Sequence, residues 1–280
     1  MSRTALDSVI DQALAEDVGA GDLTTDAVVP ADMRGSATVV VRKPGVVCGL
    51  DEALEVLRRL DPEASMERML DDGAVVAEPP QVAARLHAAM RALLTAERTA
   101  LNVLQRMSGI ATETRRYADA IAGTGVALLD TRKTAPGMRR LDKQAVACGG
   151  GTNHRSGLDD AVLIKDNHIT VAGGVGTAVH LVQQQHPELP IEVEVDTIAQ
   201  LREALDAGAE TILLDNMPPA RLREAVAICA GRARLEASGG ITLDTIRDVA
   251  ATGVDAISVG ALTHSVRALD IALEVTPSAP

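Results

Sequence analysis

The feature that most restricts the fold is a pattern that recurs between residues 126 and 260. In each repeat a short apolar, β-branched run precedes a polar or glycine-rich turn, and a stretch with helical periodicity follows. Six runs fit this pattern: VALLD (126–130), AVLIK (161–165), IEVEV (191–195), TILLD (211–215), ARLEAS (233–238) and DAISVG (255–260). They predict βα units whose parallel strands are buried on both faces.

Parallel strands of this kind form either a doubly wound sheet or a closed barrel. The reactive side chains of this chain follow the carboxyl ends of successive runs, which is where barrel enzymes carry their sites. This placement favours the barrel. Because six runs are present rather than eight, we expect an open, incomplete α/β barrel over residues 109–265.

The first part of the chain has a different pattern. A helix is expected at about residues 4–16, and strands then alternate with helices less regularly, which predicts a separate α/β sandwich domain over residues 1–108. A long helix without proline is expected over 88–122, with the domain boundary near Ser108 and Gly109. The tail, residues 266–280, is expected to pack back on the N-terminal domain.

The charge and composition limit the partners. A net charge of −12 disfavours nucleic acid and anionic membranes, so a site for an anion must be local. No run of about 18 apolar residues is present, and Asp7 and Asp11 interrupt the amino terminus, so we expect no signal peptide and a cytoplasmic location. With one tyrosine and no Phe or Trp, the core must be aliphatic.

The cysteines give little indication of a site. Cys48, Cys148 and Cys229 lie far apart in the sequence and form no Cys-x-x-Cys pair. This spacing fits a reducing compartment and argues against a disulfide framework or a zinc site. We expect three inert, small hydrophobic side chains.

Two clusters are basic. The first cluster, DTRKTAPGMR (130–139), contains the adjacent cations Arg132 and Lys133. They are either solvated on a surface loop or, at a strand end, suited to binding carboxylate and phosphate groups. In GGGTNHRSGLDDAVLIKDNH (149–168), glycines precede His154 and Arg155, and a strand ends at Lys165. The glycines allow a flexible loop or a close approach of backbone amides to an anion. A metal site from His154 and His168 is disfavoured, because a strand separates them.

Two further clusters stand out: one consists of acidic residues, and the other of turns rich in small residues. Glu194 and Asp215 end successive strands, and alternation in IEVEVD points Glu194 into the barrel, where sugar hydroxyls or hydrated magnesium could be its partner. Asp196 is expected to cap the next helix. The turns ASGGI (237–241) and SVGAL (258–262) follow the last two strands, where barrels often bind phosphate, although glycine can serve turn geometry alone.

These segments, in this order, resemble the quinolinate phosphoribosyltransferase family. The resemblance covers nearly the whole chain and is carried by the following motifs: GDLTT, ERTALNVLQRMSGIAT, LDTRKTAPGMR, CGGGTNHRSGL, LIKDNH, EVEVD, LLDN, ASGGI and SVGALTHS. It implies the type II phosphoribosyltransferase fold, which is an α/β sandwich domain followed by an open α/β barrel. It also implies transfer of phosphoribose from phosphoribosyl pyrophosphate to quinolinate with decarboxylation, in NAD biosynthesis.

The resemblance also implies roles for individual residues. It gives Lys133, Lys165, Glu194 and Asp215 catalytic roles, and Glu194 and Asp215 would hold Mg²⁺ directly or through water. It further implies a homodimer, open to further assembly, in which Arg98 reaches quinolinate in the partner's site. The substrate-binding residues that it implies are Arg98, Arg132, Lys133, Thr134, His154, Arg155, Lys165, Glu194, Asp215, Ser238, Gly239, Gly240, Ser258, Val259 and Gly260.

Departures from the family pattern are confined to uncharged positions. Val103, Gln144 and Met217 stand where relatives often have a ring, and Ser156 replaces a bulky apolar residue. Two alternatives stay open. One is a paralogue with another pyridine carboxylate or a role in molybdenum uptake, which the complete basic set disfavours. The other is a noncatalytic, aromatic-depleted scaffold.

Overall fold

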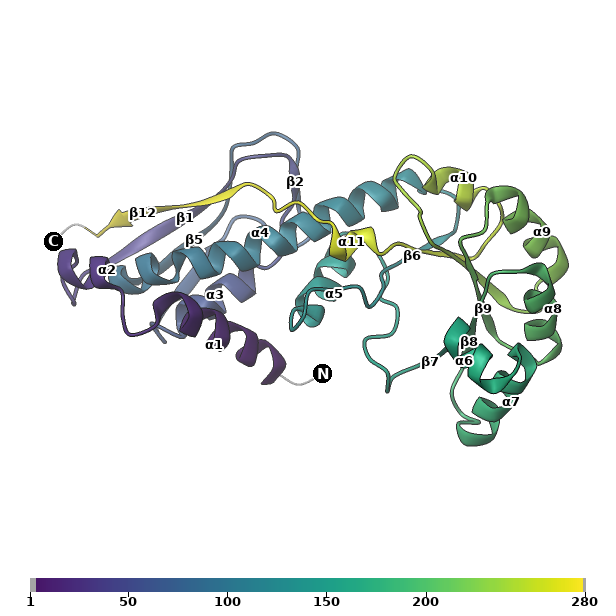
Figure 1. Ribbon diagram of the computed structural model, residues 1–280. Coiled ribbons are helices and arrows are strands. Elements are labelled where there is room, and N and C mark those ends of the chain that lie inside the picture. Colours follow the sequence, from purple (N-terminus) through teal and green to yellow (C-terminus); the bar gives the residue numbers. More distant parts are fainter. Residues whose placement is uncertain (1–3, 279–280) are drawn as a thin grey trace. The chain divides into compact units, whose positions relative to one another are not determined.

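The computed structural model describes residues 4–278, which form two compact units (Figure 1). The N-terminal unit comprises the chain up to Arg115 together with Thr134–Gly150 and the chain from Thr263 onward. The barrel unit comprises Arg116–Lys133 and Gly151–Leu262. Each unit is therefore built from separate segments of the sequence.

The N-terminal unit contains a four-stranded antiparallel sheet in the order β12-β1-β5-β3. A second, two-stranded sheet pairs β2 with β4. The strands are β1 (Arg34–Val41), β2 (Gly45–Val46), β3 (Ser65–Arg68), β4 (Val75–Val76), β5 (Gln81–Ala89) and β12 (Ile271–Pro277). The helices are α1 (Thr4–Val18), α2 (Leu23–Val28), α3 (Leu50–Arg58), α4 (Met90–Ala120) and α5 (Arg139–Cys148).

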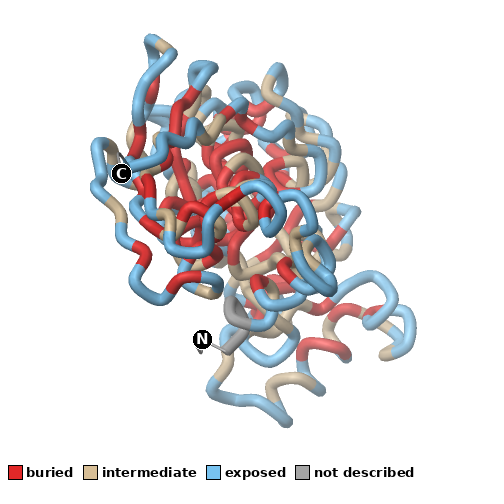
Figure 2. The backbone as a smooth tube through the Cα atoms, turned by 90° about the vertical axis from the view of Figure 1, so that its left-hand side faces the viewer, coloured by how far each residue is buried: buried red, intermediate tan, exposed pale blue. Residues whose placement is uncertain are grey.

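One face of this sheet forms a core with the helices. Ala37, Val39 and Val41 alternate along β1 and are buried, as expected for a strand with one covered face. They belong to the same apolar cluster as Ile10 of α1 and Leu93 of α4. Figure 2 shows the buried stretches enclosed by exposed segments. Sheet and helices form the two layers of the expected α/β sandwich, with a core of aliphatic side chains.

Helix α4 passes without interruption through the expected boundary at Ser108 and Gly109. Ser108 is buried, and its hydroxyl bonds the backbone of Cys48 within the N-terminal unit. A Cβ on Gly109 would lie 2.2 Å from the backbone oxygen of Arg267. These small residues therefore permit close packing within one unit, and the compact N-terminal unit continues along α4 as far as Arg115.

The C-terminal tail adds the edge strand β12, which pairs antiparallel with β1 from Gly35↔Pro277 to Val41↔Ile271. A hydrogen bond from the Leu269 N–H to the Gln105 oxygen attaches the preceding segment to α4. Figure 1 shows β12 beside β1. The last part of the chain is thus a component of the N-terminal unit.

The barrel unit contains a six-stranded parallel sheet in the order β6-β11-β10-β9-β8-β7. Each strand corresponds to one of the six runs in the sequence. The strands are β6 (Ala127–Leu129), β7 (Val162–Ile164), β8 (Ile191–Val195), β9 (Thr211–Asp215), β10 (Arg234–Ser238) and β11 (Ala256–Ser258). The helices are α6 (Asp166–Ala172), α7 (Val175–Gln185), α8 (Ile198–Asp206), α9 (Pro219–Cys229), α10 (Ile246–Ala250) and α11 (Ala261–His264). The last two residues of α11 are counted with the N-terminal unit.

The barrel is open between β6 and β7, which are consecutive in sequence but form the two edges of the sheet and do not pair with each other. Helices α8, α9 and α10 lie on its outer side in Figure 1. On the free side of β6, Thr152 forms a parallel bridge with Leu129, and the Thr152 N–H donates to the Leu128 oxygen at 2.8 Å. The expected open, incomplete α/β barrel is confirmed, and the loop after α5 partly covers its gap.

The cap of α8 differs from the expectation. Thr197, rather than Asp196, is the N-cap: its Oγ1 accepts a hydrogen bond from the Gln200 N–H at 3.2 Å. The Gln200 side chain accepts in return from the Thr197 N–H, which completes a capping box. Asp196 is exposed and lies one residue too early to take this role.

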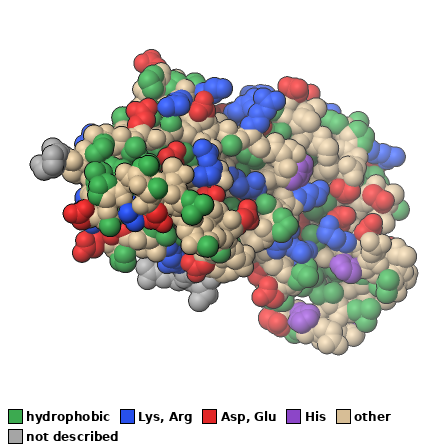
Figure 3. Space-filling view, turned by 60° about the vertical axis from the view of Figure 1, so that its left-hand side comes forward, with side chains coloured by type: hydrophobic (Ala, Val, Ile, Leu, Met, Phe, Trp, Pro, Cys, Tyr) green, Lys and Arg blue, Asp and Glu red, His purple; other side chains and the backbone are tan. Residues whose placement is uncertain are grey.

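Features of membrane proteins, or of proteins that bind nucleic acids, would show in the helices and in the surface charges. Within residues 4–278, no helix combines the length and the apolar character that crossing a membrane requires. On the face shown in Figure 3, acidic and basic side chains are interspersed rather than gathered into one extended basic surface.

Candidate active site

A cavity of about 380 Å³ lies in the barrel unit and opens among the carboxyl ends of the strands. This volume is in the range of small-molecule sites. It brings together eleven of the residues that the sequence singles out: Arg132, Lys133, His154, Arg155, Lys165, Glu194, Asp215, Ser238, Gly239, Gly240 and Ser258. The carboxyl ends of the six strands and the segments that follow them supply all of these residues except His154 and Arg155, which come from the loop between α5 and β7.

The basic side of the cavity contains Arg132, Lys133 and Arg155. Arg155 is half-buried, and its Nη1 donates to the Ala161 oxygen at 3.1 Å, which fixes the guanidinium. Burial lowers the pKa of Arg155, and the positive charge of Arg132 lowers it further. Two cations held together out of water make this side of the cavity suited to an anion.

His154 is held at the bottom of the cavity by four contacts. Its N–H donates to Oδ1 of the fully buried Asp130 at 2.8 Å, and its Nδ1 accepts from the Arg155 N–H at 2.8 Å. Because Nδ1 accepts, the ring proton lies on Nε2, which faces Glu192 at 2.9 Å and Glu236 at 3.7 Å. The imidazole therefore directs its Nε2–H at two acids rather than outward.

Glu192 and Glu236 are buried beneath the cavity, with 8% and 2% of their surfaces exposed. Burial raises the pKa of Glu236 to about 7, the charge of Glu192 raises it as well, and His154 opposes both effects. Near neutral pH Glu236 thus retains its proton in a substantial fraction of the molecules. Together with His154 they form a group whose ligand atoms lie within 4.8 Å of one another.

The acidic rim is formed by Glu194 and Asp215, at the ends of the neighbouring strands β8 and β9. Glu194 points into the cavity, and its Oε2 lies 2.9 Å from Nζ of Lys165. Lys165 is therefore the protein partner of Glu194. Oδ2 of Asp215 accepts from Nδ2 of Asn216 at 2.6 Å.

The small-residue side consists of Ser238, Gly239, Gly240 and Ser258. Gly239 has φ +93°, and a Cβ there would lie 2.2 Å from Oδ1 of Asn216. Gly240 has φ +62°, with open space around the position of a Cβ. Glycine is thus required at 239, and the turn exposes backbone to the cavity.

Four predicted residues do not line this cavity: Arg98, Thr134, Val259 and Gly260. Arg98 is an exposed residue of α4 in the N-terminal unit. Oγ1 of Thr134 accepts from Nε of Arg139. The Val259 N–H donates to the Leu129 oxygen at 3.0 Å, which continues the β11–β6 ladder, so this amide is not available to a phosphate.

The sequence reasoning missed Asp130, Glu192, Asn216 and Glu236. A signal existed for both buried glutamates, because Glu192 and Glu236 each lie two residues before a predicted site residue and therefore on the same strand face. Asn216 could have been noticed beside Asp215. Its positive φ of 53° is a conformation that Asn tolerates better than most residues.

Solved structures similar to this chain share its whole fold. NadC from Streptococcus pyogenes matches with a TM-score of 0.94 and 35% identity, over 100% of this chain and 99% of that chain. The nicotinate-nucleotide pyrophosphorylase from Francisella tularensis matches with a TM-score of 0.93 and 39% identity, over 99% and 98% of the two chains. The fold is that of the type II phosphoribosyltransferases.

Sequence comparison narrows this class. The domain families "Quinolinate phosphoribosyl transferase, N-terminal domain" and "C-terminal domain" match residues 22–108 and 110–274. Nicotinate-nucleotide pyrophosphorylase [carboxylating] of Mycobacterium leprae is 47% identical over 273 residues, which are 95% of each chain. The chain belongs to the quinolinate phosphoribosyltransferase family.

Proposed function

We propose that the protein catalyses the reaction of quinolinate with phosphoribosyl pyrophosphate. The products are nicotinate mononucleotide, carbon dioxide and pyrophosphate, and the reaction takes up one proton. The observation that carries this proposal is a single cavity in which two arginines and two lysines face two strand-end acids and a glycine turn. These groups match a dicarboxylate, a pyrophosphate, ribose hydroxyls and a 5′-phosphate.

Arg132, Lys133, Arg155 and Lys165 bind the carboxylates of quinolinate and the pyrophosphate. The half-buried Arg155 beside Arg132 gains most from an anion, because a bound carboxylate offsets the repulsion that lowers its pKa. His154 positions the adjacent backbone of Arg155 through its own contacts with Asp130 and Glu192. The guanidinium of Arg155 is thereby preorganised for its ligand.

Glu194 and Asp215 face the ribose. Their carboxylate oxygens are donors that Mg²⁺ prefers, and the substrate's phosphates and water would complete its coordination. They fit Mg²⁺ better than the His154, Glu192 and Glu236 group, which includes a nitrogen donor already engaged with the acids. Held by these two carboxylates, Mg²⁺ would supply positive charge beside the pyrophosphate.

The Ser238–Gly240 turn and Ser258 receive the 5′-phosphate. The close contact of Gly239 with Asn216 and its positive φ place unsubstituted backbone at the cavity. Phosphate sites of barrels commonly use the loops after the last strands in this way. Because the Val259 amide is committed to the sheet, the cup centres on the β10 turn.

The chemistry requires stabilisation of two charges. The pyridine nitrogen attacks the anomeric carbon as pyrophosphate leaves, and the ribose ring becomes positive in this transition state, beside Glu194 and Asp215. Lys133 and Lys165 stabilise the negative leaving group. The N-alkylated pyridinium then accepts the electron pair left when the neighbouring carboxylate departs as carbon dioxide, and that ring carbon takes up a proton.

The proposal also includes the oligomeric state of the protein and its location in the cell. We expect a homodimer in which the exposed Arg98 of one subunit binds quinolinate in the partner's cavity. The four basic residues that line one cavity support a dicarboxylate, because its two negative charges can contact more than one of them at once. The three free cysteines support action in a reducing compartment, which we take to be the cytoplasm.

The test uses purified protein with quinolinate, phosphoribosyl pyrophosphate and Mg²⁺. We expect carbon dioxide and nicotinate mononucleotide in equal amounts. Lys165→Ala should lose most of this activity, and Arg234→Ala, at the exposed amino end of β10, should retain it. Product from nicotinate but not quinolinate would favour the paralogue, and binding without turnover would favour the scaffold.

A further inference from the structure

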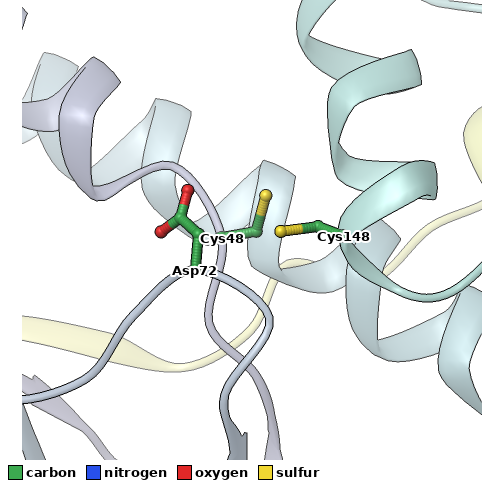
Figure 4. Close-up of side chains that lie close together, drawn as sticks. All are labelled: Cys48, Asp72 and Cys148. Atoms are coloured by element: carbon green, nitrogen blue, oxygen red, sulfur yellow. The ribbon is translucent and has the colours of Figure 1, made fainter.

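Two cysteines that are far apart in the sequence lie side by side in the N-terminal unit (Figure 4). Cys48 immediately precedes the N-cap of α3, and Cys148 is the last residue of α5. Their sulfur atoms and a carboxylate oxygen of Asp72 all lie within 4.8 Å of one another. Two of the three cysteines that lie far apart in the sequence are therefore neighbours in the fold.

The backbone holds both sulfur atoms in place. The Cys48 N–H donates to Oγ of the buried Ser108 at 3.0 Å, and that hydroxyl donates to the Cys48 oxygen at 3.1 Å. Beside Cys148, a Cβ on Gly149 would lie 2.4 Å from the Ala111 oxygen, so the end of α5 packs directly on α4. Both cysteines are thus anchored to α4.

The two thiols differ in access and in acidity. Cys48 is fully buried, whereas Cys148 is partly exposed. The neighbouring Cys148 sulfur raises the pKa of the Cys48 thiol and burial raises it further, whereas the contact with Cys48 lowers the pKa of Cys148. A partly exposed thiol of lowered pKa beside a buried thiol resembles the nucleophilic and resolving cysteines of redox sites.

We propose that Cys48 and Cys148 form a redox-modification site that reacts with low-molecular-weight disulfides. The Cys148 thiolate attacks one sulfur of oxidised glutathione and releases one glutathione thiolate. The Cys48 sulfur then attacks the Cys148 sulfur of the mixed disulfide, and the second glutathione leaves with the proton of the Cys48 thiol. The two protein thiols are oxidised to one disulfide while the glutathione disulfide is reduced to two thiols.

Asp72 argues for this chemistry over a metal site. Its Oδ2 accepts from the Gly49 N–H at 2.9 Å, and its Oδ1 accepts from the Leu50 N–H at 3.2 Å. Both oxygens therefore cap the start of α3. A zinc ion would have to compete with this cap for its third protein ligand.

The test follows the intact mass of the reduced, full-length protein during incubation with oxidised glutathione. We expect the wild type to lose the mass of two hydrogen atoms, and peptide mapping should join Cys48 to Cys148. Cys48→Ala should stop at the mixed disulfide on Cys148, because the resolving thiol is gone. Cys148→Ala should stay unmodified over the same period, and Cys229→Ala, whose cysteine is buried in the barrel unit, should react like the wild type.

Several outcomes would overturn the proposal. They are a mixed disulfide that persists on wild-type Cys148, a disulfide that includes Cys229, or equal reaction rates for the wild type and Cys148→Ala. Stoichiometric zinc binding that blocks the reaction and is lost in Asp72→Asn would identify a metal site instead. Peptide mapping of the wild type needs no variant, so a misfolded variant would not remove the test.

Discussion

At the residue scale, partial burial makes Arg155 a sensitive probe of the site. Its guanidinium is fixed by the Ala161 oxygen and repelled by Arg132, so removing it should change ligand binding more than folding. We expect Arg155→Ala to weaken quinolinate binding by about 10- to 200-fold, as for a lost charge-assisted hydrogen bond of roughly 1.5–3 kcal/mol. Titration calorimetry measures this, with Arg234→Ala as the control. Unchanged affinity would contradict the assignment of Arg155.

Glu236 links the site to the pH dependence of stability. Its pKa rises from 4.5 to about 7 on folding, so the folded state retains a proton that the unfolded state releases. This contribution is complete below pH 4.5 and is lost as the pH rises towards 7. Because glutamine cannot ionise, the free energy of unfolding of Glu236→Gln relative to wild type should increase between about pH 5 and about pH 8, on the order of 3 kcal/mol.

Urea unfolding at the two pH values measures this difference. The matched control is Glu210→Gln, because Glu210 is an exposed acid just before β9. Its effect on stability should be the same at both pH values. An equally constant effect for Glu236→Gln would mean that burial does not hold a proton on Glu236.

Individual site residues could be predicted where a charged side chain lies at or just after the carboxyl end of a predicted strand. Arg132, Lys165, Glu194 and Asp215 meet this condition, and the structure places them in one cavity. Glu236 lies inside a strand that is buried on both faces, so its spacing of two from Ser238 was the one local sign that it faces the same way. Its partner His154 approaches from a loop, so their contact could not be derived from local pattern.

At the scale of elements, the cap of α8 offers a direct comparison of two adjacent residues. Thr197→Ala removes the side-chain acceptor for the Gln200 N–H and should lower the free energy of unfolding by about 1 kcal/mol. Asp196→Ala should change it by less than about 0.5 kcal/mol, since Asp196 contributes only its N–H to the box. Thermal unfolding of both variants measures the difference. The reverse order would restore Asp196 as the cap.

Elements were predictable where periodicity is strong. All six barrel strands lie within the predicted runs, because a β-branched run between turns has few other conformations. Helix α4 was predicted as one long helix, yet a break in its helical pattern was inferred at Gly109, where the helix is continuous. A glycine that ends a helix and one that admits a neighbouring backbone look alike in sequence, and only the contact with Arg267 distinguishes them.

At the scale of the whole molecule, the proposed dimer predicts complementation. Arg98→Ala and Lys165→Ala would each impair every site of their own dimers. After subunit exchange, one site of each mixed dimer would carry neither change, so roughly a quarter of wild-type activity should return. The measurement is activity against time after mixing, with exchange followed by mass-tagged subunits. No recovery despite complete exchange would show that Arg98 acts within its own subunit.

The division into units could be predicted only in part. Local pattern separated an N-terminal sandwich from a barrel, but it could not assign Thr134–Gly150, which lies between two barrel segments in sequence and belongs to the N-terminal unit. That membership rests on contacts between residues distant in the chain, such as the bidentate pairing of Arg106 with the fully buried Asp142. Periodicity carries no information about such contacts.

The pairing of β1 with β12 has a consequence for biosynthesis. The ribosome makes β1 before β12, and the whole barrel unit lies between the two strands in sequence, so one edge of β1 has no partner until the barrel unit has been synthesised. An open strand edge invites pairing with other chains. The sheet of the N-terminal unit can therefore be completed only after the barrel unit has left the ribosome, and until then this edge of β1 is open to pairing with other chains.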